Sequence, residues 1–440
     1  MIAVALAAAL VTGLSLLALL RIRTQTVPGM GGFAFFLGVI GLALWTHALL
    51  LVRVPVALPS MLAAPVLLAA VAAWKGDRSV LRAGWGRPTI EAIPLALLLV
   101  LAAFVAFSLP VLATDGEVIY AFKARSIVHH GTFWNPDFSD PARIHPASRR
   151  PLLLPCVFAD FFMLTGGVDY RLLRLWLALL FVGSLGVLHE RARPPLLWLA
   201  AFAWMPAFWR ENEGVCAGFP DPILGVLFLL AFDALRRGER ALSILSLSAA
   251  VLLKQDAWTF PVAIALATAI TVPRQLGPAL RILLVPAALI LLWALLRTRF
   301  PWSFDFFPGQ FAPGNLLASP ANWPLVLGRL ASELVKPKHW GIFWFLALPG
   351  IVAPFRRLTR EDARWLLVVL FQAAAYVLVW STYPREEIRG WMAVQDVRLM
   401  VHLVPLLWMW LRLKWGAEPP AVHTGISTGP FSLTGGSTPP

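Results

Sequence analysis

The sequence predicts an all-α polytopic membrane protein with about 13 transmembrane helices. Of its 440 residues, 59% are hydrophobic and only 14% are charged, and the mean hydropathy is +0.74. The apolar stretches are continuous, as in helices that cross a bilayer, whereas the strands of a membrane barrel alternate apolar and polar residues. Short loops rich in arginine separate the stretches. These observations exclude a soluble globular protein and favour helices over a barrel.

The apolar stretches divide the chain into five parts. These are an N-terminal three-helix membrane segment (1–90), a transmembrane core (91–296) with a first outer loop at 114–150, a large outer loop (297–340), C-terminal transmembrane helices (341–415) and a disordered tail (416–440). The individual spans are predicted near 2–20, 33–52, 57–74, 92–113, 172–188, 195–209, 221–235, 241–253, 257–272, 279–296, 341–355, 364–381 and 397–412.

Two parts are assigned from composition rather than from apolar length. The loop 297–340 is rich in proline, glycine and aromatic residues, which suits a segment that packs at the membrane interface. The tail consists largely of Pro, Gly, Ser and Thr, and such a composition buries too little apolar surface to fold.

Basic residues cluster in short loops between the spans, and this clustering predicts the orientation. The net charge is +14, but the arginines and lysines lie where the positive-inside rule places them in cytoplasmic loops. A nucleic-acid partner is therefore not expected. The first apolar stretch is followed, not preceded, by arginines, so we expect a retained helix with its N-terminus outside. The loop residues are Arg21, Arg23, Lys75, Arg78, Arg82, Arg87, Arg191, Arg193, Arg236, Arg237, Arg240, Arg274, Arg281, Arg356, Arg357, Arg360, Arg364, Arg412 and Lys414.

The segment 151–167 is apolar but short. If it crossed the membrane, Arg191 and Arg193 would lie outside. We therefore expect a helix that lies along the outer interface.

With this topology, the outer side carries nearly twice as many acidic residues as the inner side. A functional site on the outer side would explain why acidic and basic residues gather there. The greater length of the outer loops would also explain part of this difference. The outer acids are Asp115, Glu117, Asp137, Asp140, Asp160, Asp169, Glu211, Glu213, Asp221, Asp256, Asp305, Glu333, Glu386, Glu387 and Asp396.

The stretch ATDGEVIYAFKAR, residues 113–125, places acids and bases directly after a predicted span. A carboxylate beside a low-dielectric boundary is suited to act as a general base, and Asp115 is our candidate. Lys123 and Arg125 follow within a few helical turns. The alternative is that Asp115 caps the next helix, with Glu117 in its first turn.

Three further motifs lie on the same predicted side. Asp221 precedes Pro222 at the start of a span, a pattern that also suits an ordinary helix cap. Lys254 and Asp256 form the charged tip of a predicted helical hairpin, where they suit a function or a simple ion pair. Arg398 and His402 are four residues apart and therefore share one helix face, where they suit phosphate binding or snorkelling to the interface.

These motifs, in order, resemble those of the GT-C superfamily, in particular bacterial membrane glycosyltransferases of the protein-mannosyltransferase-like and aminoarabinose-transferase-like kind. The resemblance covers roughly residues 92–412. Two departures are Thr114, where the family has an aromatic residue, and Gln255-Asp256-Ala257 in place of Asn-Glu-Gly. The matching stretches are TDGEVIYAFKAR (114–125), IHPASRRPLLLP (144–155), GFPDPILG (218–225), KQDA (254–257) and RLMVHLVP (398–405).

The resemblance implies a GT-C-like fold with juxtamembrane helices in the outer loops, and transfer of a sugar from a polyprenyl-phosphate carrier to a glycan, lipid or protein acceptor. It implies a bacterial inner membrane, with the active site facing the periplasm. Asp115 and Glu117 would be the catalytic carboxylates, with Asp115 as the general base. Asp221 would help to position the acceptor or share a divalent cation. No nucleotide is expected, because no P-loop or nucleotide-binding fingerprint is present. The residues that bind the donor and its phosphate would be Lys123, Arg125, Asp221, Lys254, Arg398 and His402.

Two other functions fit the same charges. A transporter or flippase of lipid-linked sugars would place its charges near the bilayer midplane and carry an internal repeat. A non-catalytic scaffold of envelope assembly would not need these residues close together, and a separation above about 20 Å would favour it.

Overall fold

The computed structural model describes residues 2–77, 79–80, 116–140, 150–192, 196–206, 218–299, 312–346 and 359–414, with a few isolated positions between 96 and 108. Every regular element in these residues is helical, which confirms the predicted all-α class. Most of the predicted span 92–113, the candidate base Asp115 and the tail 416–440 lie outside the described residues.

Among the described residues, six helices are long and apolar enough to cross a membrane, as in a helical membrane protein. Helices at three other predicted positions are shorter: α12 (Asp221–Arg236), α13 (Arg240–Leu253) and α14 (Phe260–Thr271) have 16, 14 and 12 residues. At 1.5 Å per residue they extend about 18–24 Å, less than the thickness of the hydrocarbon core. The full count of 13 spans therefore stays a prediction. The six are α1 (Ile2–Leu20), α2 (Val27–Leu51), α3 (Leu58–Lys75), α9 (Tyr170–Ala192), α15 (Leu276–Leu296, within the apolar stretch Pro273–Arg299) and α20 (Arg360–Ser381).

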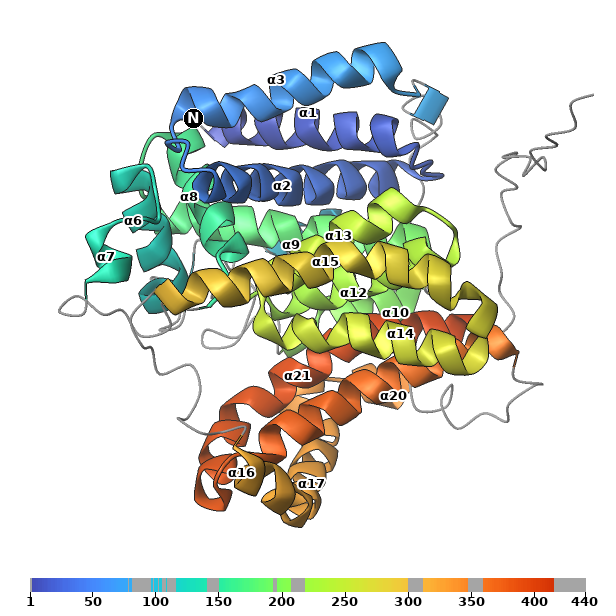
Figure 1. Cartoon of the computed structure of the whole chain (residues 1–440). Helices are drawn as coiled ribbons and strands as arrows, with labels where there is room; N and C mark the ends of the chain where they lie inside the picture. Colours follow the sequence, from blue (N-terminus) through green and yellow to red (C-terminus); the bar gives the residue numbers. More distant parts are fainter. Residues whose placement is uncertain are drawn as a thin grey trace, which may run out of the picture.

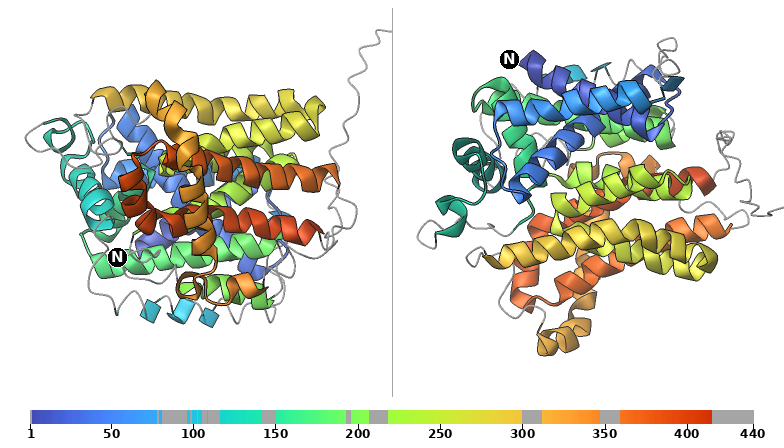
Figure 2. Two further views of the ribbon diagram at one scale, coloured as in Figure 1. Left: turned by 90° about the horizontal axis from the view of Figure 1, so that it is seen from below. Right: turned by 45° about the horizontal axis from the view of Figure 1, so that its top comes forward.

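Helices α1, α2, α3, α9 and α15 run roughly side by side, and the shorter α12, α13 and α14 lie among them or just below (Figures 1 and 2). Figure 1 shows α6, α7 and α8 together at one end, while α20 and α21 cross beneath the other helices and carry α16 and α17. The remaining elements are the π-helical turn η1 (Gly116–Ala121), α6 (Phe122–His130), α7 (Pro136–Ser139), α8 (Leu153–Thr165), α10 (Leu196–Ala203), α12 (Asp221–Arg236), α13 (Arg240–Leu253), the 3₁₀ turn η4 (Gln255–Thr259), α14 (Phe260–Thr271), η5 (Pro273–Gln275), η6 (Arg297–Arg299), α16 (Pro313–Ala318), η7 (Ser319–Asn322), α17 (Trp323–Leu334), α18 (Pro337–Trp340) and α21 (Arg385–Lys414).

Helix α8 corresponds to the short apolar segment that we expected along the membrane interface. Almost all of its side chains are buried, and it packs against α2, α6 and α1. The apolar sequence of α8 therefore reflects contact with other helices, and its position along the outer interface stays a prediction. Asp160 on this helix accepts a hydrogen bond from the Thr46 hydroxyl, which satisfies one oxygen of its buried carboxyl group (2.6 Å).

Small residues join the N-terminal helices to the rest of the bundle. A Cβ on Gly38 of α2 would lie 1.9 Å from the carbonyl oxygen of Ala9 in α1, so the two backbones are in contact there. Between α2 and α9, a Cβ on Gly32 would lie 2.7 Å from both the Gly183 carbonyl oxygen and the Gly186 Cα. Contacts between small residues let membrane helices approach closely and gain dispersion energy. The first helices are thus integral to the fold.

Replacing Gly38 by valine should destabilise the protein by about 1–3 kcal/mol or more, because backbone atoms of α1 cannot move aside like a flexible side chain. The measurement is the unfolding temperature of the detergent-solubilised protein. Gly31 on the same helix has nothing within 4 Å of a Cβ, so Gly31→Val is the matched control. Equal loss in both variants would mean that valine harms α2 itself, not its contact with α1.

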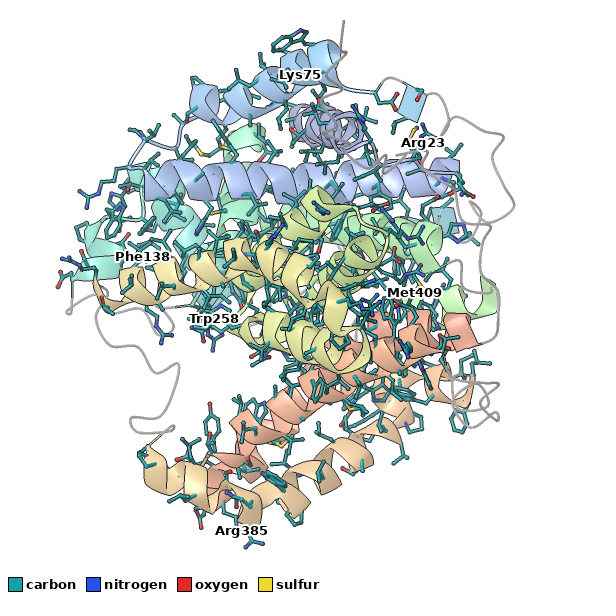
Figure 3. The ribbon with its side chains drawn as sticks, turned by 45° about the vertical axis from the view of Figure 1, so that its right-hand side comes forward. Arg23, Lys75, Phe138, Trp258, Arg385 and Met409 are labelled. Carbon is teal, nitrogen blue, oxygen red and sulfur yellow. The ribbon has the colours of Figure 1, made fainter. Side chains whose placement is uncertain are left out.

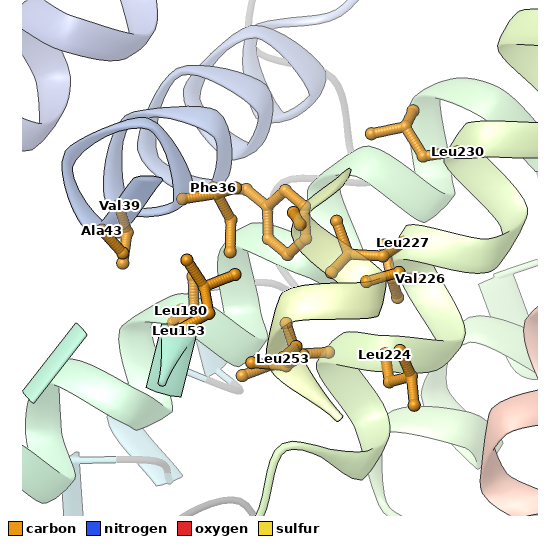
Figure 4. Packing of buried hydrophobic residues seen from close by; sticks show 14 of the residues in the cluster. Phe36, Val39, Ala43, Leu153, Leu180, Leu224, Val226, Leu227, Leu230 and Leu253 are labelled. Atoms are coloured by element: carbon orange, nitrogen blue, oxygen red, sulfur yellow. The ribbon is translucent and has the colours of Figure 1, made fainter. Parts of the chain in front are cut away.

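Helices α2, α9 and α12 share one apolar core, which reaches the end of α13 (Figure 4). Phe36, Leu180 and Leu227 are fully buried in it. Leu253, the last residue of α13, is also buried there and directly precedes Lys254. The core therefore holds the base of the charged tip.

An arginine network closes the end of the bundle at which α9 and α12 stop. Asp233 is fully buried and accepts from Arg191 (3.4 Å), Arg236 (3.3 Å) and Arg237 (2.8 Å). Arg191 also forms a bidentate pair with Glu239, at 3.0 and 2.7 Å. We call these five residues the Asp233 network. They include three of the basic residues from which the orientation was predicted.

Candidate functional site

Asp221 is the centre of the candidate site and does not cap its helix. It is the first residue of α12 and is only 2% exposed. The capping position belongs to Pro220, which makes no side-chain capping bond. The cap that the Asp-Pro pair suggested is therefore wrong, since both Asp221 carboxylate oxygens accept hydrogen bonds from other side chains.

Three donors from distant parts of the chain converge on this carboxylate. The Lys254 ammonium donates to Oδ1 at 2.7 Å, and Arg398 Nε donates to Oδ2 at 3.1 Å. His402 Nε2 lies 2.8 Å from Oδ1. The two cations favour the ionised carboxylate, which can only accept, so Nε2 carries the hydrogen of this bond.

The predicted charged tip exists and explains how Lys254 reaches Asp221. Helix α13 ends at Leu253, Lys254 is extended (φ −154°, ψ 143°), and the chain continues as η4 into α14. The Trp258 indole, labelled in Figure 3, fastens the tip by donating to the Val251 carbonyl oxygen at 2.9 Å. Lys254 also pairs with Asp256 at 2.6 Å, so its ammonium lies between two carboxylates. From the sequence, Lys254 and Asp256 suited either a functional role or a simple ion pair. In the structure they form an ion pair, and Lys254 also pairs with Asp221.

Arg398 and His402 share a face of α21, as their spacing predicts, and they are buried rather than snorkelling. Arg398 is 3% exposed and His402 is 0% exposed. The Arg398 guanidinium lies over the ring of Phe219, 4.2 Å from its centroid. On the other side of His402, the Tyr376 hydroxyl lies 2.8 Å from Nδ1 and donates to it, because Nε2 carries the imidazole hydrogen. Both ring nitrogens of His402 are therefore engaged.

The acidic stretch around residue 115 approaches the same place through its backbone. Gly218 has φ +92°, and a Cβ on it would lie 3.0 Å from the Cα of Gly116. Gly116 directly follows Asp115, and Gly218 lies just before Phe219 and Asp221. Glu117 is half-buried in η1. Asp115 itself is outside the described residues, and its proposed role as a base stays a prediction.

Lys123 and Arg125 lie on α6, a different element from those that hold Asp221. Lys123 is fully buried, and its ammonium donates to the Arg150 carbonyl oxygen at 3.3 Å. Arg125 is exposed, and its guanidinium lies over the Tyr170 ring, 5.9 Å from the centroid. The structure thus unites Asp221, Lys254, Arg398 and His402 and places Lys123 and Arg125 in other contacts.

Tyr376 and Phe219 were not predicted from the sequence, and Asp256 was recognised in the charged tip but not selected as a site residue. Tyr376 lies within the apolar helix α20 and is one of four tyrosines in the chain. A phenol in an apolar helix requires a hydrogen-bond partner, and this was the available signal. Its partner His402 could not be named from sequence, because the two helices meet only in the folded chain.

The arrangement suits an anionic ligand. Two carboxylates, Asp221 and Asp256, balance two cations, Lys254 and Arg398, so the cluster is neutral overall when His402 is neutral. An ammonium has three donors and a guanidinium has five, so one carboxylate does not exhaust them. The ammonium and guanidinium groups are already oriented by their ion pairs, so they can donate to a phosphate and stabilise its charge without rearrangement. Asp221, Asp256 and His402 also offer one atom each within 4.8 Å of one another, a spacing suited to a metal ion.

No known family, curated protein or solved structure matches this chain.

Proposed function

We propose that this protein is a membrane glycosyltransferase that moves a sugar from a polyprenyl-phosphate carrier to an acceptor hydroxyl at the outer face of a bacterial inner membrane. The observation that carries the proposal is the convergence of Lys254, Arg398 and His402 on one buried carboxylate. These three residues were selected as phosphate ligands from two separate motifs, 254–257 and 398–405, and both motifs meet at Asp221 in the fold.

The proposed reaction breaks the bond between the anomeric carbon and the phosphate oxygen and forms a bond from that carbon to the acceptor oxygen. The phosphate leaves as an anion and needs no proton if cations receive its charge. Lys254 and Arg398 supply that charge. The proton of the acceptor hydroxyl passes to a carboxylate on the opposite side of the sugar, and the configuration at the anomeric carbon inverts.

Asp115 is the proposed base, with Glu117 beside it. The close approach of Gly116 and Gly218 supports this role, because it joins the acidic stretch to the segment that carries Asp221. A scaffold would not require Lys254 and Arg398 to meet, yet they contact the same carboxylate.

The test begins with mass spectrometry of envelope glycans and lipids from cells with and without the intact gene, which identifies sugar and acceptor. Transfer is then measured with purified protein in nanodiscs. Asp115→Asn should lower kcat by at least about 100-fold, because amides do not accept the proton. Glu117→Gln, which removes the neighbouring acid, should lower kcat less. Full transfer by the Asp115 variant would overturn the assignment of the base, and unchanged envelope glycans and lipids would overturn the function.

A further inference from the structure

The Asp221 site contains the atoms of a divalent-metal site. One oxygen of Asp221, one oxygen of Asp256 and one nitrogen of His402 lie within 4.8 Å of one another. Carboxylate and imidazole ligands at such a spacing suit Zn²⁺ or Mn²⁺, with water completing the coordination. A metal therefore has to be weighed against what already lies between these atoms.

An ammonium already bridges the two carboxylates. Lys254 Nζ is 2.7 Å from Asp221 Oδ1 and 2.6 Å from Asp256 Oδ2. Its side chain is 14% exposed, so little water screens the two contacts. The ammonium thus has the same bridging position between carboxylates that a shared metal ion would have.

The candidate ligand atoms are also committed to other bonds. Asp221 Oδ1 accepts from both Lys254 and His402, and Asp221 Oδ2 accepts from Arg398. His402 Nε2 uses its hydrogen for Asp221, so it would have to give up this bond to bind a metal. Adding a divalent ion to the neutral set of two carboxylates and two cations would leave two uncompensated positive charges in a buried position.

We propose that Lys254 is the built-in cation of this site, standing in the place of a divalent metal, so that the native protein receives an anionic ligand without one. Shortening Lys254 converts the same residues into a metal site. For the proposed transfer, the charge that stabilises the leaving phosphate then comes from Lys254 and Arg398. The bridging position of Lys254 itself does not depend on the reaction.

The test measures metal binding rather than activity. The full chain is purified in detergent, stripped with a chelator, and titrated with Zn²⁺ by calorimetry, with the unfolding temperature recorded in parallel. Ligands that bind the folded state raise this temperature. The variants are Lys254→Ala, Lys254→Ala combined with Asp256→Asn, and Arg240→Ala, which removes an exposed charge from the start of α13.

We expect wild type and Arg240→Ala to show no one-to-one Zn²⁺ binding. Lys254→Ala should bind one Zn²⁺, at least about tenfold more tightly than the weakest one-to-one binding that the calorimetry detects, and gain thermal stability from it, and adding Asp256→Asn should remove both effects. A folded Lys254→Ala protein that binds no better than wild type would overturn the proposal. If Lys254→Ala does not fold, the test uses wild type and Asp256→Asn. One-to-one Zn²⁺ binding by wild type that is lost in Asp256→Asn would contradict the proposal.

Discussion

Asp221→Asn is expected to lower the free energy of unfolding by about 3–5 kcal/mol, because it removes the buried carboxylate that Arg398 and Lys254 share. It should also weaken binding of a polyprenyl monophosphate by at least about tenfold, since Asp221 orients Lys254, Arg398 and His402. An asparagine would present amide hydrogens to groups that themselves donate. The measurements are the unfolding temperature and lipid binding by native mass spectrometry.

The control ligand for this measurement is the matching polyprenol without phosphate. Its binding should not differ between wild type and Asp221→Asn, because the buried cations recognise the phosphate and not the chain. Unchanged affinity of the folded variant for the polyprenyl phosphate would show that Asp221 is not needed to organise a phosphate site.

Asp233→Asn is expected to destabilise the protein by a similar amount, about 3–5 kcal/mol, because Arg191 would lose its fully buried partner. Binding of polyprenyl phosphate by the folded fraction should not change. Asp233 lies about 18 Å along α12 from Asp221, at 1.5 Å per residue. Unfolding temperature and lipid binding are measured as for Asp221→Asn.

The two variants form a matched pair, because Asp221 and Asp233 are both on α12 and each is a buried carboxylate that pairs with basic side chains. Loss of phosphate-lipid binding in both variants would mean that general weakening of the bundle, not the chemistry at Asp221, accounts for the effect. Loss in Asp221→Asn alone would assign the effect to the site.

Several features of the fold could be predicted from sequence because they depend on short stretches of chain. Long apolar runs such as Val27–Leu51 form helices wherever they lie in a bilayer. The spacing of Arg398 and His402 places them on one face of any helix. The break after Leu253 was also visible, because charged residues interrupt an apolar run there.

Other features could not be predicted, because they depend on which helices meet. Helix α8 is as apolar as a segment on a membrane surface, yet α2 and α6 cover it. The Asp-Pro pair at Asp221 fits a helix cap in isolation, and only the approach of Lys254 and α21 makes its carboxylate the centre of an ion cluster. Tyr376 acquires its partner in the same way.

The sequence by itself determined that this is a helical membrane protein and which ionisable side chains interrupt or border its apolar runs, since hydropathy and helical spacing are properties of neighbouring residues. Only the tertiary structure decided that Lys254, Arg398 and His402 meet at Asp221 and that an ammonium lies between two carboxylates. The physical reason is that a charge buried among helices is stable only beside its partner, and here the partners of Asp221 come from distant parts of the chain.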